Sequence, residues 1–216
     1  MVEIKFCGMT RPEDAAHAAS LGAAYVGVIF AESPRRLSVS AARHVFAAVP
    51  AGIRRVGVFG QSTAREIADA ARQLPLDVAQ LHGDPGAAVV RDLRQLWDGE
   101  IWAVQRVAGD DLPTSVAQLF DVADAVVLDT KVDGRLGGTG VALPWQRLRA
   151  ALSRVRGKKA RLVVAGGLNP TNVGTAVAEL DPDVVDVSSG VESNVGVKDH
   201  DLMRAFRDAA FSTVAR

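Results

Sequence analysis

The sequence predicts a single α/β domain over residues 1–216 that folds as a (β/α)8 TIM barrel. Short runs rich in valine and isoleucine recur along the chain, as is typical of strands buried on both faces of a parallel sheet. Alanine-rich segments with helical patterning separate these runs, so strand and helix alternate eight times, the number that closes a barrel. No change in composition marks a linker, and a chain of 216 residues suits one domain of this kind.

The expected strands are apolar runs that end at turns or polar residues. They cover residues 2–6, 25–30, 54–59, 78–81, 101–105, 125–128, 162–165 and 184–187. The first helix is predicted from its ends, with Thr10 as N-cap, Pro12 in the first turn, Glu13 completing a capping box and Gly22 after the end. The later helices are expected over residues 40–49, 63–74, 86–96, 112–120, 146–155, 169–179 and 199–211.

Charge and composition narrow the possible partners. Lys and Arg together number 25, as do Asp and Glu, so the formal net charge of zero argues against a general nucleic-acid or anionic-membrane surface. No apolar run reaches the roughly 18 residues of a membrane span, and the first residues lack the order of a signal peptide. Cys7 is the single cysteine, which excludes an intrachain disulfide and favours a cytoplasmic location. The expected partner is a small molecule.

Two glycine-centred turns near the C-terminus each follow an apolar strand, at residues 166–170 and 188–192. Glycine lets the backbone approach a ligand, and free amide N–H groups with serine hydroxyls suit an anion. In TIM barrels the loops after the seventh and eighth strands commonly bind phosphate. The candidate phosphate-binding residues are therefore Gly166, Gly167, Asn169, Ser188, Ser189 and Gly190.

Acid and base candidates follow other strands at the same predicted rim. Cys7 comes after the first strand, where a thiolate would act as a base or nucleophile, although a free cysteine is most often a small buried hydrophobe. Asp129 comes after the sixth strand, where burial would raise its pKa and keep it protonated for acid catalysis. A loop cap or a surface charge is the alternative for Asp129.

Further polar residues are expected to face the barrel interior or its mouth. Arg35, in the turn after the second strand, suits a bidentate contact with a substrate carboxylate, with a solvated basic pair with Arg36 as the alternative. Gln80 and His82 share one face of the fourth strand and would line the pocket, unless His82 is only a structural hydrogen bonder. Lys5 has the same parity as Cys7, and a buried lysine requires a partner, for which Asp186 is a candidate. The sequence leaves open whether that pair is structural or contacts substrate.

The connection over residues 129–145 is long and rich in glycine, including Gly138. Loops of this length are usually functional, so we expect a lid over the sixth strand, with a surface insertion as the alternative. A dinucleotide-binding motif is excluded because Pro144 interrupts the segment and no acidic residue ends the following strand at Ala165. No His, Asp and Glu residues show metal-ligand spacing, so no metal site is predicted.

Seven motifs in order carry a family resemblance that spans residues 5–199. They are K-F-C-G-M-T at 5–10, S-P-R at 33–35, Q-L-H-G at 80–83, L-D-T at 128–130, G-G-T-G at 137–140, A-G-G-L-N-P at 165–170 and D-V-S-S-G-V-E at 186–192. With these motifs the chain resembles the phosphoribosylanthranilate isomerase family of tryptophan biosynthesis. Phe6 and Met9 stand where the family more often has isoleucine or leucine, which are conservative differences.

The resemblance implies a TIM barrel that performs an Amadori rearrangement without a metal or cofactor, as a monomer or homodimer. Asp129 would be the general acid that opens the ribose ring, and Cys7 the base that removes the C2 proton. Arg35 would hold the anthranilate part, with His82 nearby. The remaining substrate-binding candidates are Gln80, Gly138 and Asp186.

Three rival functions remain at this point. The isomerase of histidine biosynthesis performs the same rearrangement in the same fold, but that family uses an aspartate where Cys7 stands and needs room for a second phosphate. A dual-specificity isomerase is disfavoured for the same reasons. A barrel that only binds a sugar phosphate predicts at least one missing catalytic residue, and none is missing here.

Overall fold

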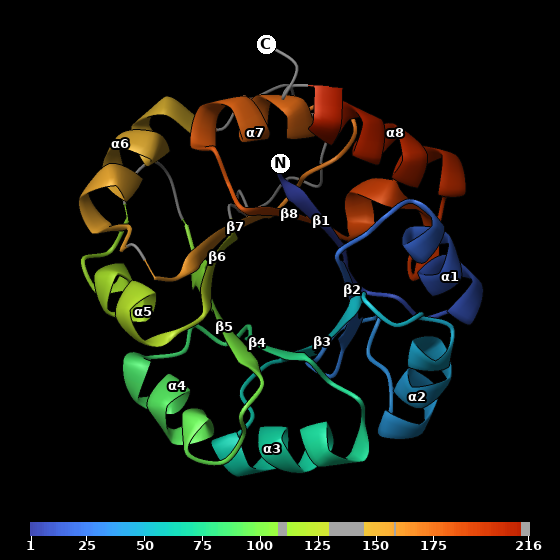
Figure 1. Cartoon of the computed structure of the whole chain (residues 1–216), viewed down its shortest axis with the longest axis horizontal. Coiled ribbons are helices and arrows are strands. Elements are labelled where there is room, and N and C mark those ends of the chain that lie inside the picture. The colour runs from blue at the N-terminus through green and yellow to red at the C-terminus, as the bar shows by residue number, and fades with distance from the viewer. Residues whose placement is uncertain (108–111, 130–144, 158, 213–216) are drawn as a thin grey trace.

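Strand and helix alternate in the computed structural model, which describes residues 1–107, 112–129, 145–157 and 159–212. Eight parallel strands form a closed ring, and helices surround it (Figure 1). The strands are β1 (Glu3–Phe6), β2 (Tyr25–Ile29), β3 (Arg54–Phe59), β4 (Val78–Leu81), β5 (Glu100–Arg106), β6 (Ala125–Asp129), β7 (Arg161–Ala165) and β8 (Val184–Val187). The helices are α1 (Pro12–Ser20), α2 (Val39–Ala47), α3 (Ala64–Gln73), α4 (Ala87–Arg94), α5 (Val116–Val122), α6 (Trp145–Val155), α7 (Val173–Leu180) and α8 (His200–Ser212). The predicted TIM barrel is confirmed.

The ring closes because β1 pairs with β8 as well as with β2. Lys5 stands opposite Tyr25 on one side and opposite Asp186 on the other. All eight strands run in the same direction, so their carboxyl ends meet at one rim. In barrels of this kind, active sites lie at that rim and the opposite rim serves stability.

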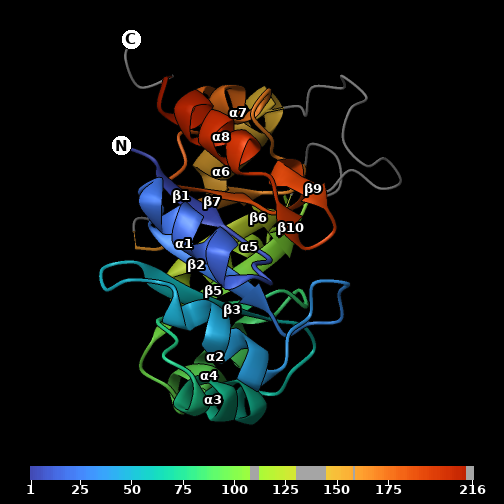
Figure 2. The same ribbon diagram turned by 90° about the vertical axis from the view of Figure 1, so that its right-hand side faces the viewer.

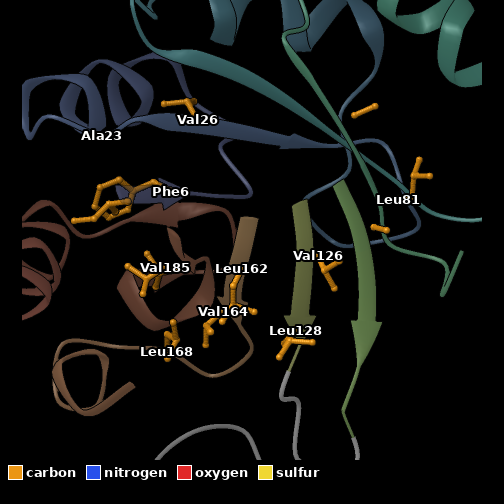
Figure 3. Close-up of a cluster of buried hydrophobic side chains, with 14 of the residues drawn as sticks. Phe6, Ala23, Val26, Leu81, Val126, Leu128, Leu162, Val164, Leu168 and Val185 are labelled. Carbon is orange, nitrogen blue, oxygen red and sulfur yellow. The ribbon is translucent and has the colours of Figure 1, made fainter. Parts of the chain in front are cut away.

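Alternation along each strand divides the apolar side chains into two layers. The outer layer lies between the strands and the helices and includes Phe6, Val126, Leu162 and Val185, which Figure 3 shows on neighbouring strands. Burial of such side chains contributes about 25 cal/mol for each Å² removed from water. The strands are therefore fixed in register by residues that face away from the site.

The inner layer fills the barrel interior, and its two largest side chains lie towards the amino end. Tyr25 and Trp102 meet edge to face there, with ring centroids 4.7 Å apart. Arg161 donates a hydrogen bond to the Tyr25 hydroxyl, and burial raises the pKa of that hydroxyl to about 12. The site is thus left to form at the other end, above this aromatic layer.

Three predicted helix starts are wrong. Helix α5 begins at Val116 rather than at Leu112, and side-chain contacts displace the starts of α1 and α7. Helix α1 begins with Arg11 as N-cap, because the Thr10 hydroxyl donates instead to the Gly196 carbonyl. The predicted capping box is absent, since Glu13 accepts from the Arg11 side chain. Helix α7 begins at Val173 rather than at Asn169, because the Asn169 side chain accepts the Thr171 amide and shapes a turn of its own. The capping box of α3, from Thr63 to Glu66, is present.

A short hairpin between β8 and α8 lies outside the predicted alternation. A 3-10 turn (Ser189–Val191) leads into β9 (Glu192–Asn194), which pairs with β10 (Val197–Lys198). Figure 2 shows this hairpin at the end of the barrel opposite the N-terminus. No helix within the described ranges is long and apolar enough to cross a membrane.

Candidate functional site

The predicted acid and base lie at the carboxyl rim of the barrel. Asp129 is the last residue of β6, while Cys7, His82 and Ser188 come directly after β1, β4 and β8. Because the strands are parallel, these residues meet at one end. Cys7 belongs to the inner layer of buried side chains, as its parity on β1 predicts.

A buried ion pair lies beneath Cys7. Lys5 Nζ donates to Asp186 Oδ2 at 2.6 Å, and their side chains are 0% and 7% exposed. Burial alone would lower the pKa of Lys5, but attraction to Asp186 and Cys7 outweighs burial and raises it. Burial raises the pKa of the Cys7 thiol, and the positive charge of Lys5 opposes that rise. The thiol is therefore favoured in the free protein, and Lys5 is the nearby cation that can stabilise a thiolate.

Gly27 on β2 provides the space for this group. A Cβ added at Gly27 would lie 3.0 Å from Cys7 Sγ and 3.2 Å from Lys5 Cε. Glycine within a strand often marks a place where another group approaches closely. The absent side chain at Gly27 lets Lys5 and Cys7 share the barrel interior.

Asp129 and His82 face each other across the rim. His82 Nε2 lies 3.6 Å from Asp129 Oδ2, and Asp129 is 9% exposed, as its position beside the barrel predicts. Burial lowers the pKa of His82, and the charge of Asp129 opposes this effect. The imidazole is neutral at neutral pH and presents a nitrogen to the Asp129 carboxyl. Gln80, on the same face of β4, is buried as expected.

Polar atoms without a partner gather at this end of the barrel. Asp186 Oδ1, Gln80 Oε1, His82 Nδ1 and Ser188 Oγ are buried and make no hydrogen bond to any described residue. Buried polar groups in folded proteins nearly always have a partner. A polar ligand in the barrel mouth would supply several of the missing partners at once.

Arg35 is held by residues for which the sequence reasoning found no role. Its Nε and Nη2 donate to Glu192 at 2.7 and 2.5 Å, and Lys198 Nζ donates to Glu192 at 2.9 Å and to the Ser188 carbonyl at 3.0 Å. The sequence does show Glu192 and Lys198 on either side of a turn at Gly196. The β9–β10 hairpin that brings these two side chains together was not predicted, so their pairing was not predicted either.

The two predicted phosphate loops touch each other. Gly166 and Gly167 have φ of 87° and 66°, values that favour glycine. A Cβ added at Gly190 would stand 1.9 Å from the Leu168 carbonyl oxygen, so the backbones of the two loops are in direct contact. Ser188 and Ser189 stand just before Gly190, and Asn169 follows Leu168. All six candidate phosphate-binding residues thus lie in two adjoining loops.

Gly8 joins the base to both predicted anion sites. It has φ of 68°, and an added Cβ would lie 2.7 Å from Ser188 Oγ and 2.8 Å from Arg35 Cδ. Cys7 immediately precedes it. The predicted base, Arg35 and the second phosphate loop therefore meet at this turn of the backbone.

The predicted lid, with Gly138, lies outside the described residues. Within the described ranges, no three His, Cys, Asp or Glu side chains are grouped so that they could hold a metal ion. The assembled groups are a carboxyl, a thiol beside a cation, an arginine and two loops rich in amide N–H groups. Such a set can move protons within a small anionic molecule held at both ends.

Comparison with known proteins gives a consistent result. The family model "N-(5'phosphoribosyl)anthranilate (PRA) isomerase" matches residues 4–209. The N-(5'-phosphoribosyl)anthranilate isomerase of Rubrobacter xylanophilus is 42% identical over 98% of this chain and 100% of its own. The crystal structure of phosphoribosyl anthranilate isomerase from Thermotoga maritima aligns with a TM-score of 0.85 and 33% identity, over 98% of this chain and 100% of its own.

A solved phosphoribosyl anthranilate isomerase in complex with reduced 1-(o-carboxyphenylamino)-1-deoxyribulose 5-phosphate aligns with a TM-score of 0.82 and 31% identity. The alignment covers 98% of this chain and 100% of that one. The order of the motifs, the closed barrel and these full-length matches agree. This chain belongs to the N-(5'-phosphoribosyl)anthranilate isomerase family.

Proposed function

We propose that this chain converts N-(5'-phosphoribosyl)anthranilate into 1-(2-carboxyphenylamino)-1-deoxyribulose 5-phosphate, an Amadori rearrangement in tryptophan biosynthesis. Its membership of the isomerase family supports the reaction. The observation that carries the assignment of the site is the gathering of Cys7, Asp129 and four partnerless buried polar atoms at one rim. The substrate has a carboxylate at one end and a phosphate at the other, which matches an arginine and two glycine-rich loops.

Asp129 is the proposed acid of the first step. Its proton passes to the ribose ring oxygen, the bond from that oxygen to C1 breaks, and the anilino nitrogen forms a double bond with C1. His82, which is neutral and 3.6 Å from the carboxyl, is placed to orient Asp129.

Cys7 is the proposed base of the second step. The thiolate takes the C2 proton of the Schiff base, and the electron pair moves to give an enolamine. This intermediate becomes the product when C1 gains a proton and the C2 hydroxyl loses one. The rearrangement only relocates hydrogens, so an acid and a base account for it without an oxidant or reductant. Lys5, paired with Asp186, would stabilise the thiolate while it exists.

The two ends of the substrate are assigned to separate anchors. Arg35 would bind the anthranilate carboxylate, since a guanidinium and a carboxylate match in geometry. The loops containing Gly166 and Ser188 would bind the phosphate through backbone N–H groups and hydroxyls. A reducing compartment such as the cytoplasm suits this proposal, because Cys7 must remain a thiol.

The proposal is tested by generating phosphoribosylanthranilate in situ and following its consumption by the purified protein. Cys7→Ala and Asp129→Asn should each lower kcat by about 10²–10⁴, while binding of the reduced product analogue changes little. Asp69→Asn, which alters an exposed carboxylate on α3, is the matched control and should turn over normally. Wild-type turnover in both site variants would refute the mechanism.

A parallel assay separates the rival isomerase. The aminoaldose of the histidine pathway should not be consumed, because its second phosphate has no assigned anchor. Consumption of both substrates would show dual specificity. Binding of the product analogue without turnover of either substrate would indicate a barrel that has lost catalysis.

A further inference from the structure

A chain of charged side chains links the predicted carboxylate anchor, Arg35, to the second phosphate loop, at Ser188. Arg35 pairs with Glu192, Glu192 accepts from Lys198, and Lys198 donates to the Ser188 carbonyl. The Glu192 side chain is 5% exposed and that of Lys198 is fully buried. Ion pairs buried to this degree hold their geometry far better than surface pairs do.

Glu192 binds only one edge of the Arg35 guanidinium group, and a second edge of that group stays available. Glu192 is bound through Nε and Nη2 of Arg35, and no hydrogen bond joins Nη1 to any described residue. An arginine side chain has five N–H donors, so the Nη1 and Nη2 edge can still receive a second carboxylate. Glu192 therefore fixes the orientation of Arg35 and still leaves N–H donors of Arg35 for a substrate carboxylate.

The three side chains of Arg35, Glu192 and Lys198 together carry an excess of positive charge. With Lys198 protonated, Arg35 and Lys198 carry two positive charges and Glu192 carries one negative charge. Burial lowers the pKa of Lys198, and its hydrogen bond to Glu192 opposes that fall. Burial raises the pKa of Glu192, but the hydrogen bonds from Arg35 and Lys198 outweigh burial and lower it, so the carboxylate stays ionised. The neighbouring Lys5 and Asp186 neutralise each other. The net charge of the group suits one further carboxylate.

Lys198 keeps Glu192 in place through its own backbone as well as its ammonium group. Its main-chain N–H donates to Asp14 on α1, and Lys198 is opposite Glu192 in the β9–β10 ladder. Both ends of the Lys198 residue are thus attached to fixed parts of the barrel. We therefore expect Glu192 to stay hydrogen-bonded to Arg35 when the substrate binds.

We propose that Glu192 and Lys198 are positioning residues for substrate carboxylate recognition, because they hold Arg35 with its second edge directed to the substrate. This inference rests on the proposed isomerase activity. Neither residue contacts the reacting atoms. Their effect should appear in the affinity for the carboxylate and not in the proton transfers.

The test compares two substrates in wild type and in Glu192→Gln. One is phosphoribosylanthranilate, and the other is the analogue made from aniline, which lacks the carboxylate. With the first, we expect KM to rise by about tenfold to thirtyfold in the variant, since a released arginine regains most of its rotamer entropy, and kcat to stay unchanged. With the second, KM should not change.

The ratio of the two substrates cancels any loss of folded protein, because misfolding would affect both equally. Glu32→Gln removes an exposed carboxylate from the loop that also carries Arg35 and serves as the matched control. In an Arg35→Ala background, Glu192→Gln should raise KM no further.

Each result decides the matter. An equal rise in KM for both substrates, an unchanged KM or a fall in kcat alone would overturn the positioning role. A lower KM in Glu192→Gln would show that Glu192 competes with substrate for Arg35, which also overturns it. Absence of turnover in the wild type would refute the proposed function and this inference with it.

Discussion

The contact between the two phosphate loops can be tested with one methyl group. Gly190→Ala would place a Cβ 1.9 Å from the Leu168 carbonyl oxygen, whereas ordinary van der Waals contact begins at 3.4 Å. The position of the Cβ is fixed by the backbone and its neighbour is a backbone oxygen, so no side-chain rotation can relieve the clash. One loop must therefore move by about 1.5 Å, which is more than a hydrogen-bonded phosphate tolerates.

A displacement of this size sets the expected loss. Misplacement by about 1 Å costs on the order of a hundredfold in rate when a substrate depends on exact positioning. We expect kcat/KM for phosphoribosylanthranilate to fall by about that factor, with weaker binding of the reduced product analogue. Overpacking should also lower the free energy of unfolding by about 1–3 kcal/mol.

The assay needs a control for the change from glycine to alanine itself. Gly86→Ala serves, because Gly86 has φ of −73° and an added Cβ would meet nothing within 4 Å. Steady-state kinetics, calorimetric binding of the analogue and urea unfolding should be compared for both variants. If Gly190→Ala keeps the wild-type kcat/KM and analogue affinity, the two loops do not form the phosphate site.

Three further predictions concern the barrel interior. Burial raises the pKa of Cys7, the single cysteine of the chain. The rate of its alkylation by iodoacetamide should therefore still increase above about pH 8.5, because the reactive thiolate is still forming there. A rate that becomes constant at lower pH would contradict the raised pKa. Trp102→Ala, which removes a fully buried ring beside Tyr25, should cost about 3–5 kcal/mol in urea unfolding, and a much smaller cost would place the ring outside the packed layer. Lys5→Met should cost about 3–5 kcal/mol at neutral pH because it leaves the Asp186 carboxylate unpaired, and adding Asp186→Leu should restore most of the loss. Unfolding curves of the single and double variants check the last point, which fails if the double variant is no better than the single.

The fold could be predicted from the sequence because the barrel depends on local patterns. Each β-like run of valine and isoleucine lies between helical segments, and parallel strands need such crossovers. One error occurred where a side chain is used by a distant segment, as Thr10 is by Gly196, since no local pattern contains that partner. The start of α7 was instead displaced by the short turn that Asn169 forms with Thr171. The β9–β10 hairpin was missed for a related reason, because its strands are too short to give a periodic signal.

The site was predicted in part. Strand parity is a local property, so the inward direction of Cys7 and Gln80 and the pairing of Lys5 with Asp186 followed from it. The pairing of Arg35 did not follow, because its partner lies 157 residues away in an unpredicted hairpin. The raised pKa of Cys7 also depends on the surrounding atoms that exclude water, which a sequence does not reveal.

The ion pair between the first and the last strand of the ring has a consequence for biosynthesis. Lys5 leaves the ribosome early, whereas its partner Asp186 follows 181 residues later. Until the eighth strand is available, closing the barrel would enclose an ammonium group with no counter-charge, at a cost of about 3–5 kcal/mol. This cost disfavours closure of the barrel in incomplete chains, and the ring closes only when both β1 and β8 are present.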